Sequence, residues 1–293
     1  MTVTGNGAAG ASILDPAGLR RYREGFEEDG FTVVRGLFGS DEIDRLCGEF
    51  TALRAAGPVP GHFEPRAEDG PGADPLNVWP RVMHPHEING LAREVLLDAR
   101  LRTVLEALLG EEVLAAQSMF YFKPPGARGQ ALHQDNFYLR VEPGTCVAAW
   151  VACDVIDREN GGLEVVPGTH RMDVFCPEVA DSDVSFAREY VPPPPGLAPV
   201  PVDMAPGDVL FFNGSLVHGS QPNRADERFR RSFIGHYVGR SAERIGRFYR
   251  TLEMSGARVE LAESEGAGPC GTEFEPQGPA LSFERTVQCP AMG

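Results

Sequence analysis

The chain has 293 residues, of which 42% are hydrophobic and 24% charged, which is ordinary for a globular protein with a substantial core. Its net charge of −15 repels phosphate backbones, and no window approaches the roughly 18 consecutive apolar residues of a membrane helix. The N-terminus has neither an early basic cluster nor a long apolar run, so it lacks the features of a signal peptide. We therefore expect a cytoplasmic protein without a nucleic-acid or membrane partner.

The first part of the chain has the periodicity of helices. Asp15-Pro16 is typical of a helix start, because Asp caps the first turn and Pro suits the first helical position. Apolar residues then recur at helical spacing until Gly30, a natural stop. A short strand is expected over 31–34. A second helix is expected from Ser40 to Gly57.

A Pro/Gly-rich loop is expected over 58–80, and helical periodicity returns over about 87–109. From Val113 onward the pattern changes to short apolar or alternating runs. These runs are Val113–Phe122, Cys146–Ile156, Leu163–Val166, Val209–Phe212 and Ser232–Val238. Because Gly- and Pro-containing turns separate them, they indicate an antiparallel sandwich or barrel.

We predict one domain after a disordered N-terminus at 1–12. It spans 13–293, with a helical N-terminal layer at 13–110, a β core at 111–240 and a C-terminal segment at 241–293. The chain also has six cysteines, none in a C-x-x-C pair, which argues against a zinc knuckle or a thioredoxin-like site. We expect all six to be reduced thiols, mostly packed in the core.

His133-Gln134-Asp135 is the first motif that carries chemistry. If this segment is extended, alternation places His133 and Asp135 on the same face, where both can bind one metal ion. His218 lies 85 residues downstream of His133, at the end of another expected strand. H-x-D with a distant His is the facial triad of non-haem Fe(II) oxygenases. It leaves three positions of an octahedral metal open for a bidentate 2-oxo acid and O2.

A 2-oxo diacid also requires a cation for its distal carboxylate, and Arg suits this best because its guanidinium binds bidentately. Arg230-Arg231 stands on the strand expected after His218. Arg230 and Ser232 share one face of that strand and Arg231 takes the other, so only one of the two arginines can face a pocket. The ordinary alternative is that both are solvated charges at a sheet edge.

Eight segments occur in one order across residues 117–238. They are Gln117–Gly126, Leu132–Asp135, Ala149–Ala152, Glu159–Leu163, Val166–Arg171, Pro206–Val209, His218–Ser220 and Phe229–Arg231. Together they resemble the phytanoyl-CoA dioxygenase family of Fe(II)/2-oxoglutarate oxygenases. The N-terminal helices are consistent with this family but not specific to it.

The resemblance implies that His133, Asp135 and His218 are iron ligands. It implies a cosubstrate pocket formed by Arg230, Ser220, Met119, Trp150, Lys123 and Gln117. Within it, Arg230 would pair with the C5 carboxylate of 2-oxoglutarate, and Ser220 would donate its hydroxyl. The interval from His218 to Arg230 is about one residue longer than is typical of the family, so Arg228 and Arg231 stay open as alternatives.

The implied fold is mainly β with flanking helices, a double-stranded β-helix of the jelly-roll or cupin-like type. The implied cofactor is Fe(II), with 2-oxoglutarate and O2 as cosubstrates and ascorbate as a stimulatory additive. The reaction would yield succinate and CO2 and oxidise an unactivated C–H bond of a small-molecule substrate. Hydroxylation is the default outcome, with desaturation, ring closure and epimerisation open. The Arg-rich composition, with one lysine, adds bacterial secondary metabolism as an expectation.

Two other functions are consistent with part of this pattern. A cupin-like metal enzyme, such as an isomerase or hydrolase, uses the same ligands without 2-oxoglutarate, and Arg230 would then be dispensable. A non-catalytic binding module would have a decayed site, which the intact triad and the placed arginine argue against. His84-Pro85-His86 is also an H-x-H motif, but the sequence places no partner carboxylate near it, so we expect no metal there.

Overall fold

The computed structural model describes residues 13–66 and 74–268, so the predicted disorder at 1–12 lies outside the described residues. The α-helices are α1 (Pro16–Asp29), α2 (Ser40–Ala56), α3 (Pro75–Val78), α4 (Gly90–Leu96), α5 (Ala99–Leu109) and α6 (Asn136–Leu139). Two 3-10 helices are η1 (Pro85–Glu87) and η2 (Thr169–Arg171). No helix in the described residues is long and apolar enough to cross a membrane.

The helix boundaries follow local capping. The Asp15 carboxylate accepts a hydrogen bond from the backbone N–H of Gly18 at 2.7 Å, and Gly30 ends α1 in the left-handed region with φ 86°. The prediction of a single helical stretch over 87–109 is wrong, because two helices lie there. Asp98 caps a new helix by accepting from the N–H of Arg100 at 2.7 Å, so α4 and α5 are separate. A cap at Asp74 likewise places α3 inside the expected loop.

Two β-sheets form the centre of the fold. The larger follows the order β1 (Phe31–Val34), β10 (Val209–Asn213), β5 (Cys146–Ala152), β12 (Ser232–Gly239), β3 (Val113–Tyr121), β14 (Thr251–Glu253) and β15 (Arg258–Val259), with β2 (Val82–Met83) also paired to β3. The smaller follows the order β4 (Gln130–His133), β11 (His218–Ser220), β6 (Leu163–Val165) and β9 (Val200–Pro201). Two outlying pairs are β7 (Glu178–Val179) with β8 (Glu189–Tyr190), and β13 (Arg244–Ile245) with β16 (Ala262–Glu263).

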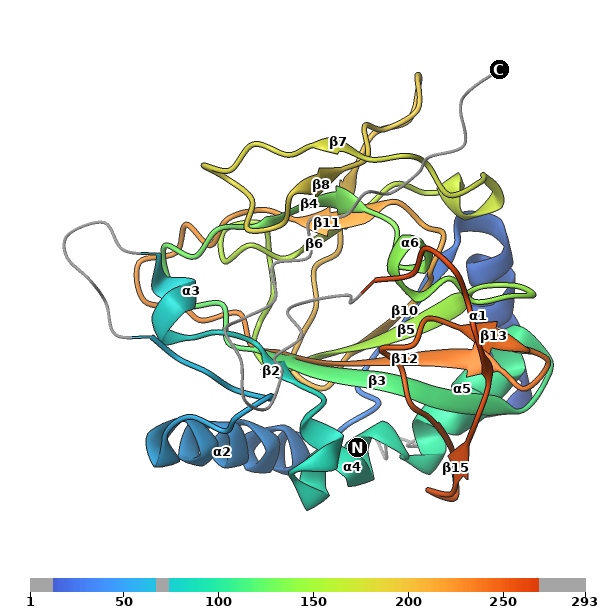
Figure 1. Ribbon diagram of the computed structural model, residues 1–293, viewed down its shortest axis with the longest axis horizontal. Helices are drawn as coiled ribbons and strands as arrows, with labels where there is room; N and C mark the ends of the chain where they lie inside the picture. Colours follow the sequence, from blue (N-terminus) through green and yellow to red (C-terminus); the bar gives the residue numbers. More distant parts are fainter. Residues whose placement is uncertain (1–12, 67–73, 269–293) are drawn as a thin grey trace, which may run out of the picture.

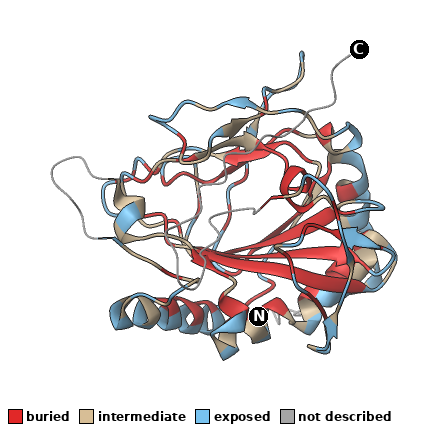
Figure 2. Cartoon of the chain, in the orientation of Figure 1, coloured by how far each residue is buried: buried red, intermediate tan, exposed pale blue. Residues whose placement is uncertain are grey.

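The larger sheet lies between two layers (Figure 1). Helices α1, α2, α4 and α5 cover one face, and the smaller sheet lies over the other. Strand alternation divides the core accordingly: Val147 and Val151 of β5 belong to the cluster on the helix side, whereas Ala148 and Trp150 belong to the cluster between the sheets. The central strands are buried along their length (Figure 2). This is the double-stranded β-helix that the resemblance implies, and the site lies between its sheets.

The predicted division into a helical layer at 13–110 and a β core at 111–240 stays a prediction. Two strands of the N-terminal part, β1 and β2, belong to the larger sheet. The prediction for the cysteines was right in part. Cys47, Cys146 and Cys153 are buried free thiols. Cys176 is disulfide-bonded, so the expectation of a reduced thiol is wrong there, because pairing depends on which segments the fold brings together rather than on sequence spacing. Cys270 and Cys289 lie outside the described residues.

Candidate active site

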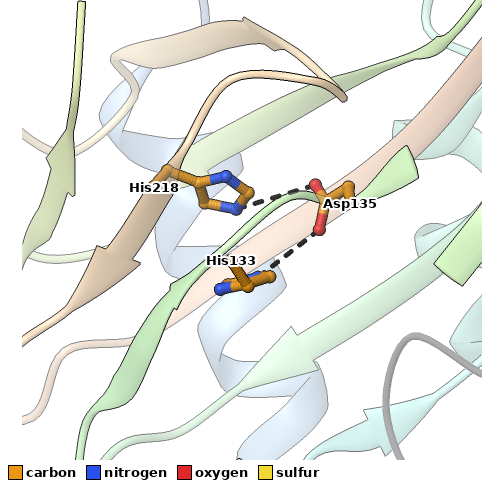
Figure 3. Close-up of side chains that lie close together, drawn as sticks. All are labelled: His133, Asp135 and His218. Atoms are coloured by element: carbon orange, nitrogen blue, oxygen red, sulfur yellow. Dashed lines mark ion pairs between the residues drawn. The ribbon is translucent and has the colours of Figure 1, made fainter. Parts of the chain in front are cut away.

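Three side chains converge between the two sheets (Figure 3). His133 ends β4, Asp135 immediately precedes α6, and His218 begins β11. Each offers one ligand atom, and the three atoms lie within 4.8 Å of one another. The Nε2 of His133 is 3.5 Å from Oδ1 of Asp135, and the Nε2 of His218 is 3.7 Å from Oδ2. Within the described residues this is the one cluster of such side chains that could hold a metal ion.

Strand pairing and a tight turn bring the three together. In the antiparallel pair β4–β11, His218 lies directly opposite His133, and their ring centroids are 4.3 Å apart. Asp135 has a helical backbone, with φ −62° and ψ −36°, so the expectation of an extended segment is wrong at this residue. The carboxylate reaches the histidines because the chain turns into α6. His218 begins a strand instead of ending one, since a turn closed by Leu216 N–H to Asn213 C=O separates it from β10.

The surroundings orient both histidines for metal binding and favour the metal-binding forms of His218 and Asp135. The Nδ1 of His133 and of His218 each lie within hydrogen-bond distance of the backbone carbonyl two residues earlier, at 2.8 and 3.0 Å. Because a carbonyl only accepts, Nδ1 carries the hydrogen and Nε2 keeps its lone pair. Burial lowers the pKa of His218 to about 4. Burial alone would raise the pKa of Asp135, but His218 and the other nearby histidines hold it well below its usual range. Neutral imidazoles and an ionised carboxylate are the forms that bind metal.

A small cavity adjoins the triad. Besides the triad it is lined by Met119, Tyr121, Gln130, Trp150, Leu163, Phe186, Phe212, Gly219, Ser220, Arg230, Ile234 and His236. Four of the six residues expected to form the cosubstrate pocket are therefore at its wall: Met119, Trp150, Ser220 and Arg230.

The other two expected pocket residues, Lys123 and Gln117, are not at this wall. The Nζ of Lys123 donates to Oγ of Ser220 at 3.0 Å and to the carbonyl of Gly161 at 2.9 Å. Lys123 lines an adjoining pocket, whose wall shares Tyr121, Phe186 and Arg230 with this cavity. Gln117 lies on β3 opposite His236, further along the strand than the lining residue Met119. The placement of these two side chains in the cosubstrate pocket stays a prediction.

The three candidate arginines have different environments. Arg231 points away from the cavity and pairs with Asp154 at 2.6 Å, and Arg228 pairs with Asp157 at 2.8 Å near the surface. Arg230 is only 3% exposed. It donates to neutral acceptors, from Nε to the carbonyl of Gly161 at 3.1 Å and from Nη1 to Oγ of Ser232 at 3.2 Å.

Burial lowers the pKa of Arg230 to about 10, which leaves the guanidinium charged at neutral pH. A buried charge is costly unless an opposite charge compensates it, and no ion pair joins Arg230 to a carboxylate in the described part of the chain. The positive charge of Arg230 at this wall of the cavity would therefore favour binding of an anion.

The turn at Asn160-Gly161-Gly162 positions the side chains of both Arg230 and Lys123. The carbonyl of Gly161 accepts from Arg230 and from Lys123 at once. Gly161 has φ +75°, and a Cβ there would lie 2.8 Å from Nζ of Lys123 and 2.5 Å from the carbonyl oxygen of Gln221. Only glycine fits at this position.

Tyr121, Gln130 and Phe186 are among the lining residues that the sequence did not predict. Tyr121 was within reach of prediction, because it alternates with Met119 along β3 and so shares its face. Gln130 lies at the start of the short β4, with its Nε2 3.0 Å from Nε2 of His133. Phe186 lies in the irregular segment between β7 and β8, which has no periodicity to indicate its direction. His84 and His86 are not part of the metal-binding cluster found among the described residues.

Residues 26–232, more than half of the chain, match the model of the family described as phytanoyl-CoA dioxygenase. The chain belongs to the phytanoyl-CoA dioxygenase family. The peroxisomal phytanoyl-CoA dioxygenase of Mus musculus is 30% identical over 259 residues, covering 83% of this chain and 75% of its own length. Phytanoyl-CoA dioxygenase 1 of Oryza sativa subsp. japonica is 27% identical, covering 70% and 75%. As a member of this family, the chain is a non-haem iron, 2-oxoglutarate-dependent enzyme.

Solved structures share the fold of this phytanoyl-CoA dioxygenase family member. The epimerase SnoN, in complex with Fe3+, alpha ketoglutarate and nogalamycin RO, has a TM-score of 0.62 at 24% identity, with coverage of 78% of this chain and 86% of SnoN. The apoform of EctD from S. alaskensis has a TM-score of 0.60 at 25% identity, with coverage of 75% and 76%. Both support the cupin-like jelly roll.

Proposed function

We propose that this chain oxidises an unactivated C–H bond of a small molecule, with hydroxylation as the default outcome. One observation carries the proposal: the His133, Asp135 and His218 cluster shares a cavity with Arg230, a buried cation that has no carboxylate partner in the described part of the chain. The cluster would hold Fe(II), which, when bound, supplies the activation of O2 at the expense of 2-oxoglutarate. The protein's own contribution is to bind and orient the diacid and the substrate.

Different residues at the cavity wall would bind the diacid and exclude water from it. Arg230 would bind the distal carboxylate of 2-oxoglutarate, because its neutral acceptors hold the guanidinium in place without neutralising it. The Oγ of Ser220 accepts from Lys123 and from the backbone N–H of Gln130, so its own hydrogen can point to the same carboxylate. Met119 and Trp150 would exclude water from the bound diacid. A cupin-like isomerase or hydrolase would not need Arg230, because it binds no 2-oxoglutarate carboxylate.

The substrate is proposed to be a small molecule of bacterial secondary metabolism, handled in the cytoplasm. This proposal rests on the Arg-rich, Lys-poor composition taken with the family. Nucleic acid is an unsuitable partner for a chain of net charge −15.

Incubation of the protein with Fe(II), ascorbate, 2-oxoglutarate and pools of candidate metabolites tests the proposal. We expect iron-dependent formation of succinate and, in the productive pool, a product heavier by one oxygen atom, both followed by mass spectrometry. A protein without iron is the control. Product formation that needs the metal but not 2-oxoglutarate would favour the cupin-like alternative and overturn the proposal.

Halogenation is not expected from this chain. Halogenases of this fold replace the triad carboxylate with a small residue, which opens a position for chloride, whereas Asp135 is present here beside both histidines. Two imidazoles, one carboxylate and bidentate 2-oxoglutarate leave one of six positions, and O2 requires it. Reactions with excess chloride or bromide should give products whose masses show oxidation alone. A halogenated product from the wild-type protein would remove Asp135 from the ligand set.

A further inference from the structure

A fourth buried side chain contacts the triad. His236 lies on β12 of the larger sheet, is 0% exposed, and its Nε2 is 3.0 Å from Oδ2 of Asp135. A carboxylate only accepts, so Nε2 carries the hydrogen and donates it. The Nδ1 of His236 has no hydrogen-bond partner among the described residues, so the interaction with Asp135 is the polar contact that fixes this ring.

The regular alternation of β12 explains why a histidine reaches this point. Arg230 precedes the strand, and Ser232, Ile234 and His236 follow it at intervals of two, so all four share one face. Arg230, Ile234 and His236 all line the cavity. The same edge of the cavity is therefore formed by one strand, with the cation for the cosubstrate at one end and a donor to Asp135 at the other.

The two oxygens of Asp135 have different surroundings. Oδ1 lies 3.5 Å from Nε2 of His133, while Oδ2 accepts from His236 at 3.0 Å and lies 3.7 Å from Nε2 of His218. A hydrogen bond to Oδ2 orients the carboxylate plane and lowers the ability of that oxygen to bind a metal as well. The hydrogen bond from His236 thereby disfavours binding of the metal through both oxygens at once.

We propose that His236 is a positioning residue that restricts Asp135 to metal binding through one oxygen. The inference rests on the proposed function. The number of oxygens that Asp135 contributes matters because the metal has six coordination positions. Two imidazoles and one carboxylate oxygen leave three of these, which 2-oxoglutarate and O2 would fill. A carboxylate that binds through both oxygens leaves two, and 2-oxoglutarate alone would fill them. His236 would thus keep one position free for O2.

Two substitutions of His236 separate the hydrogen bond from the volume of the ring. His236→Gln can place its amide N–H near the position of the imidazole Nε2, whereas the amide of His236→Asn is too short to reach Asp135. The probe is Co(II), titrated by calorimetry into metal-free protein, with the visible Co(II) spectrum as the readout of coordination. His86→Gln is the matched control, because His86 is buried and bonded to Ser118 at 2.6 Å, away from the triad.

We expect His236→Asn to bind Co(II) roughly 10–100-fold more weakly than wild type and to show an altered spectrum, as is typical when a group that supports a metal ligand is lost. His236→Gln and His86→Gln should stay close to wild type. Equal affinity and an unchanged spectrum in a folded His236→Asn protein would overturn the inference, as would equal losses in the Asn and Gln variants. Co(II) binding that is undiminished in an Asp135→Ala variant would instead contradict the proposed function itself.

Discussion

Replacement of any one of His133, Asp135 and His218 with Ala is expected to reduce iron-dependent decarboxylation of 2-oxoglutarate to background while the protein stays folded. Each variant removes one of three converging ligand atoms, which weakens metal binding and breaks the facial triad on which the reaction depends. The fold should survive because these side chains line a cavity and are not part of a hydrophobic cluster.

Bound iron and released CO2 are the measurements for this prediction, and circular dichroism checks the fold. His170→Ala is a matched control, since His170 lies in η2 near the surface, with Nε2 3.2 Å from the carbonyl of Glu27. Full activity in any one of the three triad variants would remove that residue from the ligand set. Loss of activity in the His170 variant would show that histidine removal in general is harmful.

Arg230→Ala should raise the 2-oxoglutarate concentration needed for half-maximal rate by roughly 10–100-fold, the equivalent of losing a charge-assisted pair of about 1.5–3 kcal/mol. Arg231→Ala should change it far less, because Arg231 is occupied by Asp154 on the opposite face of the chain. Its effect should appear in stability instead, as a lower melting temperature, since Asp154 loses its partner. Arg230→Lys should be intermediate, because an ammonium keeps the charge but lacks the bidentate fork.

Steady-state rates at varied 2-oxoglutarate, with melting curves for each variant, decide this prediction. Arg228→Ala is a further control, as Arg228 bonds to Asp157 near the surface. If the Arg231 variant shows the larger rise in the half-saturating concentration, the strand is shifted by one residue from the register described. If neither variant responds, the cosubstrate carboxylate binds elsewhere.

The features that were predictable from sequence are those with a local cause. The start of α1 at its Asp15 cap, its end at Gly30 and the start of α2 at Ser40 were all anticipated, because capping and glycine signals act within a few residues. The separation of Arg230 from Arg231 was also anticipated. It required only that the chain be extended there, where alternation gives opposite faces.

The features that were missed depend on contacts between distant segments. Strands β4 and β11 are short and exist because they pair with each other, so apolar periodicity did not reveal them. The H-x-D pattern grouped Asp135 with the two histidines, but on the assumption of an extended backbone. The turn into α6, which actually directs the carboxylate to them, is not visible in that pattern. Phe186 reaches the cavity wall from an irregular segment.

A crystal structure of the protein with a divalent metal and 2-oxoglutarate, obtained without O2, tests the central claim most directly. The account predicts one metal ion bonded to Nε2 of His133, Nε2 of His218 and an oxygen of Asp135, with the far carboxylate of 2-oxoglutarate on Arg230. A metal bound at another set of side chains, or a 2-oxoglutarate molecule whose far carboxylate lies away from Arg230, would contradict it.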